Sequence, residues 1–306
     1  MKILIAPSSF GEISKQPKKL IENAGYSIIE NPYGRKLTES EVVELAIDCV
    51  GIVAGLEPLN SNVIDKLPKL KCISRVGVGM DNVDIEYANS KNIKVLNTPN
   101  GPTRSVAELT MGMVFSLLRR IPQADSNMKK QIWKKETGNL LLEKKIGIIG
   151  LGRIGRMVAE MFRALGNPVV GYDIYPDKRW AEQNNVELCE LKELLEQSDI
   201  ITLHIPGSTD KKPIITNIEL EYCKKSSIII NITRGGVIDE LALYDALISG
   251  RIKAAAIDVF EEEPYKGQLT TLDNVILTPH IGSYASEGKL QMEIDSVENL
   301  INALKG

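Results

Sequence analysis

The stretch KIGIIGLGRIG, residues 145–155, decides the fold of this chain. Its first half is a short apolar run, which is typical of a buried strand in a parallel sheet. Gly150, Gly152 and Gly155 follow with the spacing GxGxxG, and a helix predicted over Ile154–Leu165 comes next. A strand, a glycine-rich turn and a helix in this order are typical of a dinucleotide-binding βαβ unit.

Each glycine in this turn has a physical role. The first allows the tight turn, the second lets the backbone approach a pyrophosphate, and the third lets helix and strand pack closely. The helix N-terminus offers free N–H groups to phosphates, and Arg153 can add positive charge. Asp173 ends the next predicted strand, where a carboxylate accepts the ribose hydroxyls of NAD and repels the 2′-phosphate of NADP. NAD is therefore the predicted cofactor, although Lys178 and Arg179 lie close enough in sequence to keep NADP open.

Short apolar runs alternate with helical stretches along the whole chain, which predicts parallel α/β sheets. A second series of alternating strands and helices begins at Lys145, and 306 residues are enough for two domains. Helices are expected at Lys18–Ala24, Ser105–Arg120 and Ser283–Leu304. The predicted strands of the first part are Lys2–Ala6, Tyr26–Glu30, Val50–Ala54, Cys72–Ser74 and Lys94–Asn97. Those of the second part are Ile146–Gly150, Val169–Tyr172, Ile200–His204, Ile228–Ile232, Ala254–Val259 and Val275–Leu277.

The composition excludes several classes of protein. The formal net charge is -3 with both signs interspersed, so neither nucleic acid nor an anionic membrane is an expected partner. No stretch approaches the roughly 18 apolar residues of a membrane span. The four cysteines are dispersed without a CxxC pair, so no metal site is expected, and free thiols together with the lack of a signal sequence predict a soluble cytoplasmic protein.

The two histidines, His204 and His280, are the default candidates for proton transfer near neutral pH. His280 follows the last predicted strand, at the carboxyl end where ligands of open α/β sheets bind. A polar residue at a strand end with no catalytic role is the alternative. His204 also ends a strand, and we expect it to serve the cofactor pocket or the structure.

Two further charged residues end predicted strands. Arg234, followed by two glycines, can place its guanidinium on a carboxylate, or it can be a solvated surface residue. Asp258 lies in an apolar strand end, where burial is costly without a partner, and a nicotinamide amide could supply one.

Taken together, these segments resemble the D-isomer-specific 2-hydroxyacid dehydrogenase family, and most closely short D-3-phosphoglycerate dehydrogenases without C-terminal regulatory domains. The resemblance runs from about Val50 to the C-terminal helix. Besides the glycine turn and Asp173, it is carried by RVGVGMDNVD (75–84), NTPNG (97–101), SVAELT (105–110), NITRGG (231–236), AAIDVFEEEP (255–264) and PHIG (279–282).

The resemblance implies two flavodoxin/Rossmann-like parallel-sheet domains with the active site in the cleft between them. A discontinuous substrate-binding domain would comprise residues 1–98 and 281–306, and an NAD-binding Rossmann domain residues 99–280. It also implies a homodimer formed through the NAD domain.

Residue roles follow from the same resemblance. The implied catalytic residues are His280, its partner Glu263, and the substrate-binding Arg234. The implied cofactor-binding residues are Gly150, Gly152, Arg153, Ile154, Gly155, Asp173, His204, Ile205, Ile232, Thr233, Asp258 and Gly282. The implied substrate-binding residues are Arg75, Val76, Gly77, Val78, Gly79 and Asn100.

The resemblance favours 3-phosphoglycerate and 3-phosphohydroxypyruvate as the substrate pair, and thus serine biosynthesis. Ala54, however, occupies the position where such enzymes often carry a phosphate-binding arginine, although Arg75, Arg104, Lys134 or Lys135 could supply the charge. Hydroxypyruvate or glyoxylate reduction is the alternative within the family. An NAD(H)-sensing regulatory protein is the alternative from another class.

Overall fold

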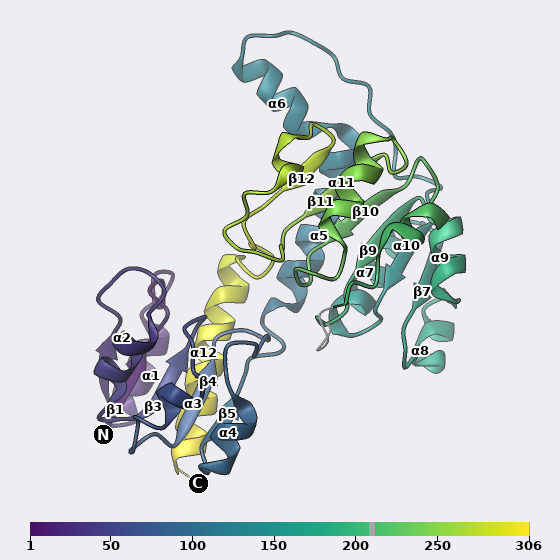
Figure 1. Cartoon of the computed structure of the whole chain (residues 1–306). Coiled ribbons are helices and arrows are strands. Elements are labelled where there is room, and N and C mark those ends of the chain that lie inside the picture. The colour runs from purple at the N-terminus through teal and green to yellow at the C-terminus, as the bar shows by residue number, and fades with distance from the viewer. Residues whose placement is uncertain (208–211, 306) are drawn as a thin grey trace. The chain divides into compact units, whose positions relative to one another are not determined.

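The computed structural model describes residues 1–207 and 212–305, which form two compact units. The first unit comprises residues 1–103 and 283–306, and the second comprises residues 104–282 (Figure 1). The first unit is discontinuous because the C-terminal helix α12 (Ser286–Lys305) packs against α1 (Gln16–Asn23) and the strands of the first sheet.

The sheet of the first unit is parallel and has five strands in the order β2-β1-β3-β4-β5. The strands are β1 (Lys2–Ile5), β2 (Ser27–Glu30), β3 (Cys49–Ala54), β4 (Cys72–Arg75) and β5 (Lys94–Leu96). This is the flavodoxin-like order, in which the direction of winding reverses between β1 and β3. All of β3 is buried, as its apolar sequence predicts for a central strand.

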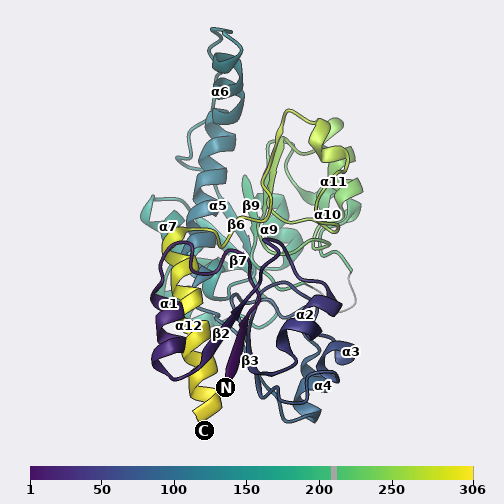
Figure 2. The same ribbon diagram turned by 90° about the vertical axis from the view of Figure 1, so that its left-hand side faces the viewer.

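Helices cover both faces of this sheet because successive side chains of each strand point to opposite sides. Ile3 and Val53 pack with α1 and α12 on one face, whereas Leu4 and Ile52 pack with the other helices. Those other helices are α2 (Glu39–Ala46), α3 (Ser61–Ile64) and α4 (Ile85–Ser90), which lie opposite α1 and α12 in Figure 2.

The sheet of the second unit is parallel and has seven strands in the order β12-β11-β10-β9-β6-β7-β8. The strands are β6 (Ile146–Ile149), β7 (Val169–Tyr172), β8 (Val186–Leu188), β9 (Ile200–Leu203), β10 (Ile228–Asn231), β11 (Ala254–Ile257) and β12 (Val275–Leu277). Winding reverses between β6 and β9, as in a Rossmann sheet. The two predicted parallel-sheet domains are therefore confirmed, while β8 was not predicted.

Helices again cover both faces of the second sheet. Helices α5 (Pro102–Arg119) and α7 (Arg153–Ala164) pack on one face through residues such as Val114 and Phe162. The opposite face carries α9, α10 and α11, with Leu195 and Leu243 in their shared core. The remaining bounds are α6 (Ile121–Lys129), α8 (Lys178–Gln183), α9 (Leu191–Gln197), α10 (Asn217–Tyr222), α11 (Glu240–Ile248) and the 3₁₀ helix η1 (Gln268–Thr271).

Helix α6 is an arm of the second unit that the sequence did not predict. Arg120 adopts the left-handed conformation (φ 53°) and separates α6 from α5. None of the residues of α6 is buried, and α6 with the loop that follows it projects away from the seven-stranded sheet in Figures 1 and 2. This arm, which comprises α6 and residues 130–140, contributes no buried side chain to the core of the unit.

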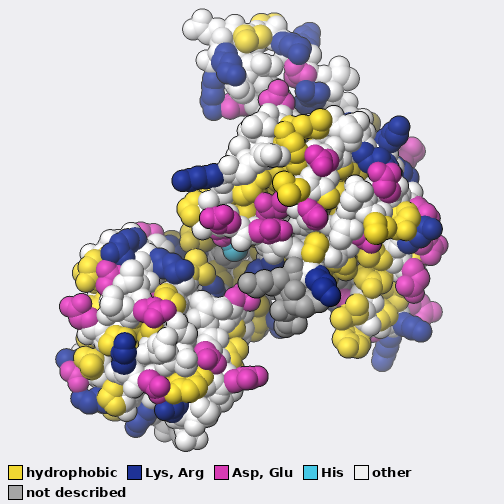
Figure 3. Space-filling model, in the orientation of Figure 1, with side chains coloured by type: hydrophobic (Ala, Val, Ile, Leu, Met, Phe, Trp, Pro, Cys, Tyr) yellow, Lys and Arg dark blue, Asp and Glu magenta, His cyan; other side chains and the backbone are white. Residues whose placement is uncertain are grey.

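The surface carries charges of both signs. On the face shown in Figure 3, basic and acidic side chains are interspersed over each unit. Among residues 1–207 and 212–305, no helix has both the length and the apolar character needed to cross a bilayer.

Candidate active site

The glycine turn between β6 and α7 has the form that a dinucleotide requires. Gly150 has φ +95°, and a Cβ on it would lie 2.6 Å from the carbonyl oxygen of His204. A Cβ on Gly155 would lie 1.9 Å from the carbonyl oxygen of Gly150, so only glycine fits there. A Cβ on Gly152 would meet no atom within 4 Å. The fold itself therefore demands Gly150 and Gly155, whereas Gly152 keeps open a space in front of the helix.

This open space lies at the N-terminus of α7. Gly152 is the N-cap residue and makes no side-chain capping bond, so the first N–H groups of α7 can serve an anion. Arg153 is exposed and Ile154 is half-buried at the start of the helix. These features fit the pyrophosphate of NAD.

Asp173 is fixed beside the same turn. Its Oδ2 accepts a hydrogen bond from the Leu151 N–H at 2.7 Å, and its Oδ1 accepts one from the Tyr175 N–H at 2.9 Å. Each carboxylate oxygen has a further lone pair, which fits the two hydroxyls of an adenosine ribose. Lys178 and Arg179 are both exposed in α8.

His204 follows β9 on the other side of the reversal point. Its Nε2 lies 2.9 Å from the hydroxyl of Thr202, and its buried Nδ1 has no hydrogen-bond partner within the described parts of the chain. Burial lowers the pKa of His204 to about 3, so the imidazole is neutral at physiological pH. A neutral ring agrees with a pocket or structural role for His204, and the roles predicted for Ile205 and for His280 stay predictions.

His280 stands in a loop just after β12 and is paired with a carboxylate. Its Nδ1 lies 3.0 Å from Oε2 of Glu263, while Oε1 of Glu263 accepts the Phe260 N–H at 3.2 Å. The His280 side chain is 43% exposed, so its ring can be reached from solvent. His280 also has φ +53°, an uncommon conformation for a side chain that is often found at functional sites.

Asp258 is the anchor of the His280 loop. It is fully buried, and its carboxylate accepts three hydrogen bonds, from the Thr278 hydroxyl (2.6 Å), the Ile281 N–H (2.8 Å) and the Gly282 N–H (2.8 Å). The backbone carbonyl of Asp258 also accepts the His280 N–H at 2.8 Å. The protein itself therefore satisfies the carboxylate that the sequence suggested a nicotinamide amide could satisfy, and a role toward the nicotinamide stays a prediction.

Arg234 lies in the turn that follows β10. Asn231 shapes this turn, because its side-chain oxygen accepts the N–H and hydroxyl of Thr233 and its amide donates to the Arg234 carbonyl. A Cβ on Gly235 would lie 1.9 Å from the carbonyl oxygen of Phe260, so the turn packs tightly on the segment after β11. The guanidinium donates to the Thr233 carbonyl at 2.7 Å, and the side chain is half-buried.

The glycine loop of the first unit follows β4. The N–H of Val76 donates to the Ala54 carbonyl at 2.8 Å, and the N–H of Gly77 donates to the Thr98 hydroxyl at 2.7 Å. The resemblance implies that the four backbone N–H groups of residues 76–79 hold the substrate carboxylate, and two of them are thus used within the protein. Val78 and Gly79 are the N–H groups that remain candidates for a substrate carboxylate.

The guanidinium of Arg75 lies against this loop. A Cβ on Gly77, which has φ +135°, would clash with Arg75 Nη1 at 1.7 Å, and this Nη1 donates to the Val76 carbonyl at 2.8 Å. Arg75 can therefore add positive charge where a carboxylate would bind. Asn100 is exposed, and its backbone carbonyl accepts the Thr103 N–H at 3.2 Å.

The structure thus gathers the predicted residues into three groups. One group follows β11 and β12 and consists of His280, Glu263, Asp258 and Gly282. The turn after the neighbouring strand β10 adds Ile232, Thr233 and Arg234 to this group. The cofactor residues gather after β6, β7 and β9, at the reversal point of the same sheet. The substrate-binding segment 75–79 belongs to the first unit.

Sequence reasoning missed two residues that organise these groups. Thr278 holds Asp258, and Thr98 holds Gly77. Thr98 is 1% exposed, and a hydroxyl next to a strand end was the available signal in both cases. That signal is weak because most threonines bond only to their own backbone or to water.

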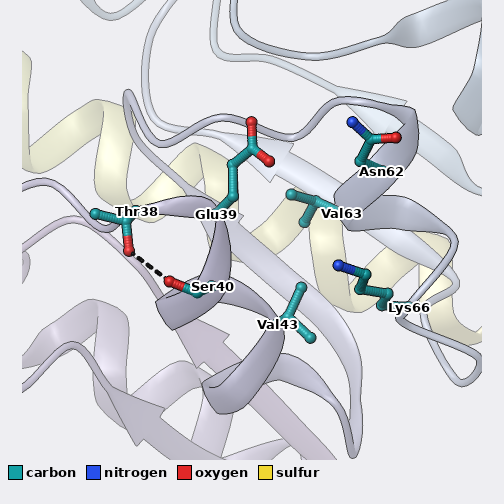
Figure 4. Close-up of a pocket in the computed structure, with 7 residues that line it drawn as sticks. All are labelled: Thr38, Glu39, Ser40, Val43, Asn62, Val63 and Lys66. Carbon is teal, nitrogen blue, oxygen red and sulfur yellow. Dashed lines mark hydrogen bonds between the residues drawn. The ribbon is translucent and has the colours of Figure 1, made fainter.

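A separate hollow of about 550 Å³ lies between α2 and α3 in the first unit (Figure 4). Its lining is Thr38, Glu39, Ser40, Val43, Asn62, Val63 and Lys66. None of the predicted site residues is among them. The Thr38 and Ser40 hydroxyls, at the start of α2, line one part of this hollow and lie 3.2 Å apart.

Comparison with known proteins shows the family. Residues 111–282 match the model of the D-isomer specific 2-hydroxyacid dehydrogenase NAD binding domain. The chain belongs to this family, and its second unit contains the NAD-binding domain.

Three relatives illustrate the range of the family. The chain is 43% identical to D-3-phosphoglycerate dehydrogenase of Methanocaldococcus jannaschii over 94% of its own length and 55% of the relative. It is 39% identical to hydroxypyruvate reductase of Thermotoga maritima over 83% of its own length and 84% of the relative. The crystal structure of D-lactate dehydrogenase from Aquifex aeolicus with NAD and lactic acid superposes with a TM-score of 0.84 at 27% identity, covering 100% of this chain and 96% of that one. The chain spans about half the length of the D-3-phosphoglycerate dehydrogenases that it matches.

Proposed function

We propose that this protein interconverts a D-2-hydroxy acid and its 2-oxo acid by NAD-dependent hydride transfer. The observation that carries the proposal is the His280–Glu263 pair at 3.0 Å, on a loop anchored by buried Asp258. This pair lies at the carboxyl edge of the same sheet whose reversal point fits a dinucleotide. Family membership supports the same chemistry.

In this mechanism NAD supplies the hydride acceptor, and NADH the hydride donor, when bound at the turn of Gly150–Gly155. His280 removes the hydroxyl proton during oxidation and donates a proton to the C2 oxygen during reduction. Glu263 accepts a hydrogen bond from Nδ1 of His280, which orients the ring and leaves Nε2 for the substrate. A histidine within reach of a carboxylate is a common arrangement for general acid–base catalysis.

Arg234 is the predicted binding partner of the substrate carboxylate in the second unit. Arg234 offers a guanidinium suited to a carboxylate, and it would also polarise the C2 oxygen. In the first unit, the N–H groups of Val78 and Gly79, with Arg75 beside them, are the predicted donors to a substrate carboxylate.

The relatives support two kinds of substrate. The name of the Methanocaldococcus relative supports the predicted pair of 3-phosphoglycerate and 3-phosphohydroxypyruvate. The Thermotoga relative, named hydroxypyruvate reductase, supports an unphosphorylated acid. Both fit the chemistry of His280 and Arg234, because the two acids share the carboxylate and the C2 oxygen.

The test is oxidation of NADH by the purified protein with 3-phosphohydroxypyruvate, hydroxypyruvate, glyoxylate, pyruvate and 2-oxoglutarate. Turnover of at least one of them is expected. A protein that binds NADH tightly and reduces none of these acids would contradict the proposal and favour the NAD(H)-sensing alternative.

We also propose a homodimer formed through the NAD-binding unit, and a cytoplasmic location. The dimer is supported by exposed apolar side chains on α6 and the following loop, including Trp133 at 81% and Leu140 at 68% exposure. The location is supported by the four cysteines, which are all free thiols, as is usual in a reducing compartment.

A further inference from the structure

The carboxylate that pairs with His280 depends on the turn to which it belongs. This turn follows β11 and comprises residues 260–263, and within it Oε1 of Glu263 accepts the Phe260 N–H at 3.2 Å. The other oxygen, Oε2, lies 3.0 Å from Nδ1 of His280. Because the Glu263 side chain is 39% exposed and is not enclosed by packing, the backbone of the turn decides where its carboxylate lies.

A second carboxylate, from helix α11, holds this turn. Glu240 is the first residue of α11, and its Oε1 accepts the Glu261 N–H at 2.7 Å. A hydrogen bond to an ionised carboxylate is about twice as strong as one between neutral groups. Two successive N–H groups of the turn are thus bound by carboxylates, that of Phe260 by Glu263 itself and that of Glu261 by Glu240.

Glu240 is not needed to cap its own helix. The N-cap residue of α11 is Asp239, and its Oδ1 accepts the N–H groups of Leu241 and Ala242 at 3.0 Å each. The Glu240 side chain is half-buried and reaches instead to the turn after the neighbouring strand β11. Its hydrogen bond therefore serves a segment outside α11.

The surroundings of Glu240 make its negative charge costly. Burial raises the pKa of Glu240, and the like charges of Glu261 and Asp239 raise it further, whereas the hydrogen bond from the Glu261 N–H opposes the rise. The bond to the turn is thus an interaction that favours the ionised carboxylate. A charge is kept at a place where its acidic neighbours disfavour it, and the bond joins that charge to the turn of Glu263.

Phe260, the first residue of the turn, is fixed by packing. A Cβ on Gly235 would lie 1.9 Å from its carbonyl oxygen, and its ring stacks on that of Tyr265 with centroids 4.1 Å apart. Glu261 is exposed, and its N–H is held by Glu240. Loss of the Glu240 carboxylate should therefore loosen the part of the turn that leads to Glu263.

We propose that Glu240 is a positioning residue that holds the turn of residues 260–263, so that the Glu263 carboxylate stays beside Nδ1 of His280. Its effect on the reaction passes through Glu263 and not through contact with substrate or cofactor. The inference rests on the proposed dehydrogenase function and adds a residue to it. All of these residues belong to the second unit.

Two substitutions of Glu240 test the proposal, with kcat measured on whichever of the five 2-oxo acids above is reduced fastest. Glu240→Ala should lower kcat by about tenfold, because a charge-assisted hydrogen bond to the turn is lost. Glu240→Gln keeps an oxygen acceptor at the same length and should retain at least about one third of the wild-type kcat. Binding of NADH should stay near that of wild type in both, because the glycine turn follows β6.

Glu262→Ala is the matched control. It removes an exposed carboxylate from the same turn and leaves the bond between Glu240 and the Glu261 N–H in place. We therefore expect a kcat near that of wild type. The melting temperature and the affinity for NADH are measured for every variant, so that a folding defect is recognised.

A double-mutant cycle with Glu263→Ala shows whether Glu240 acts through Glu263. Without a carboxylate at position 263, Glu240→Ala should lower kcat little further, because residues that act as a unit do not have additive effects. A residue that merely stabilises the fold would lower kcat by the same factor in both backgrounds.

A loss of kcat in Glu240→Ala that is recovered in Glu240→Gln and absent in the Glu263→Ala background supports the inference. An unchanged kcat in Glu240→Ala, an equal loss in both backgrounds, or a loss of NADH binding would overturn it and leave the dehydrogenase function intact. If the wild type reduces none of the five acids, the proposed dehydrogenase function fails, and this inference falls with it.

Discussion

At the scale of single residues, removal of the His280 side chain should abolish most of the catalytic rate and leave NADH binding unchanged. His280→Ala should lower kcat by about 10²–10⁴-fold, the usual contribution of a general acid–base group. Steady-state NADH oxidation measures kcat, and quenching of tryptophan fluorescence measures NADH affinity, which should change little because the glycine turn lies after a different strand.

Glu263→Gln is the companion to that variant, since it keeps the size of the side chain and removes its charge. We expect a smaller loss of kcat than for His280→Ala, because the ring stays in place but loses its ionic partner. Turnover near wild type in His280→Ala would remove this residue from the mechanism.

His204 should make the second unit sensitive to acid. Its pKa is lowered to about 3 in the folded state against an ordinary value of 6.5, so the unfolded chain binds a proton at pH 5 that the folded chain does not. The contribution of His204 to stability is therefore complete above pH 6.5. It is lost at about 1.4 kcal/mol per pH unit as the pH falls from 6.5 toward 3.

His204→Gln, which cannot titrate, should lose less unfolding free energy than wild type between pH 7 and pH 5. Urea unfolding followed by tryptophan fluorescence reports this unit, because both tryptophans, Trp133 and Trp180, belong to it. Equal losses in both proteins would mean that His204 is protonated in the folded state.

At the scale of elements, two glycines of the turn from β6 to α7 should have different roles, Gly152 in binding and Gly155 in packing. Gly152→Ala should leave the melting temperature near wild type, because its Cβ meets no atom within 4 Å. It should weaken NADH binding by at least about tenfold, because the methyl group fills the space where a pyrophosphate approaches.

Gly155→Ala is the matched control in the same turn. Its Cβ would lie 1.9 Å from the Gly150 carbonyl oxygen, so we expect destabilisation of about 1–3 kcal/mol by overpacking. If Gly152→Ala bound NADH as tightly as wild type, the pyrophosphate would not lie at this turn.

Some helices and strands could be predicted from the sequence and others could not. Strands such as Ile228–Asn231 were predictable because they are continuous apolar runs buried on both faces. Strand β8 was missed because it has three residues at the edge of the sheet, with Glu187 exposed in the middle. Helix α6 was missed because it buries no residue, so its sequence lacks the apolar periodicity of a helix that packs on a core.

The candidate site was partly predictable for a similar reason. His280, Asp258 and Arg234 could be found because each charged or titratable residue follows an apolar strand. The partners of Asp258 could not, because Thr278, Ile281 and Gly282 are brought to it by the path of the loop.

At the scale of the whole molecule, the arm around α6 should decide the oligomeric state. Trp133→Glu should convert a dimer into a monomer, because it places a charge among the exposed apolar side chains of the arm. Sedimentation velocity measures the change in mass.

Leu241→Glu is the control for that experiment. Leu241 is 68% exposed in α11, outside the arm, so its replacement should leave the mass unchanged. A monomeric wild type, or a dimer that survives Trp133→Glu, would contradict an interface on the arm.

The most direct test of the central claim follows the hydride itself. The protein is supplied with NADH carrying deuterium at C4 on the transferable face, together with hydroxypyruvate, and the product is examined by mass spectrometry and chiral chromatography. We predict a D-2-hydroxy acid with the deuterium at C2, formed by wild type and at least about 10²-fold more slowly by His280→Ala. NADH that stays unconsumed, or a product without deuterium at C2, would contradict hydride transfer to a 2-oxo acid.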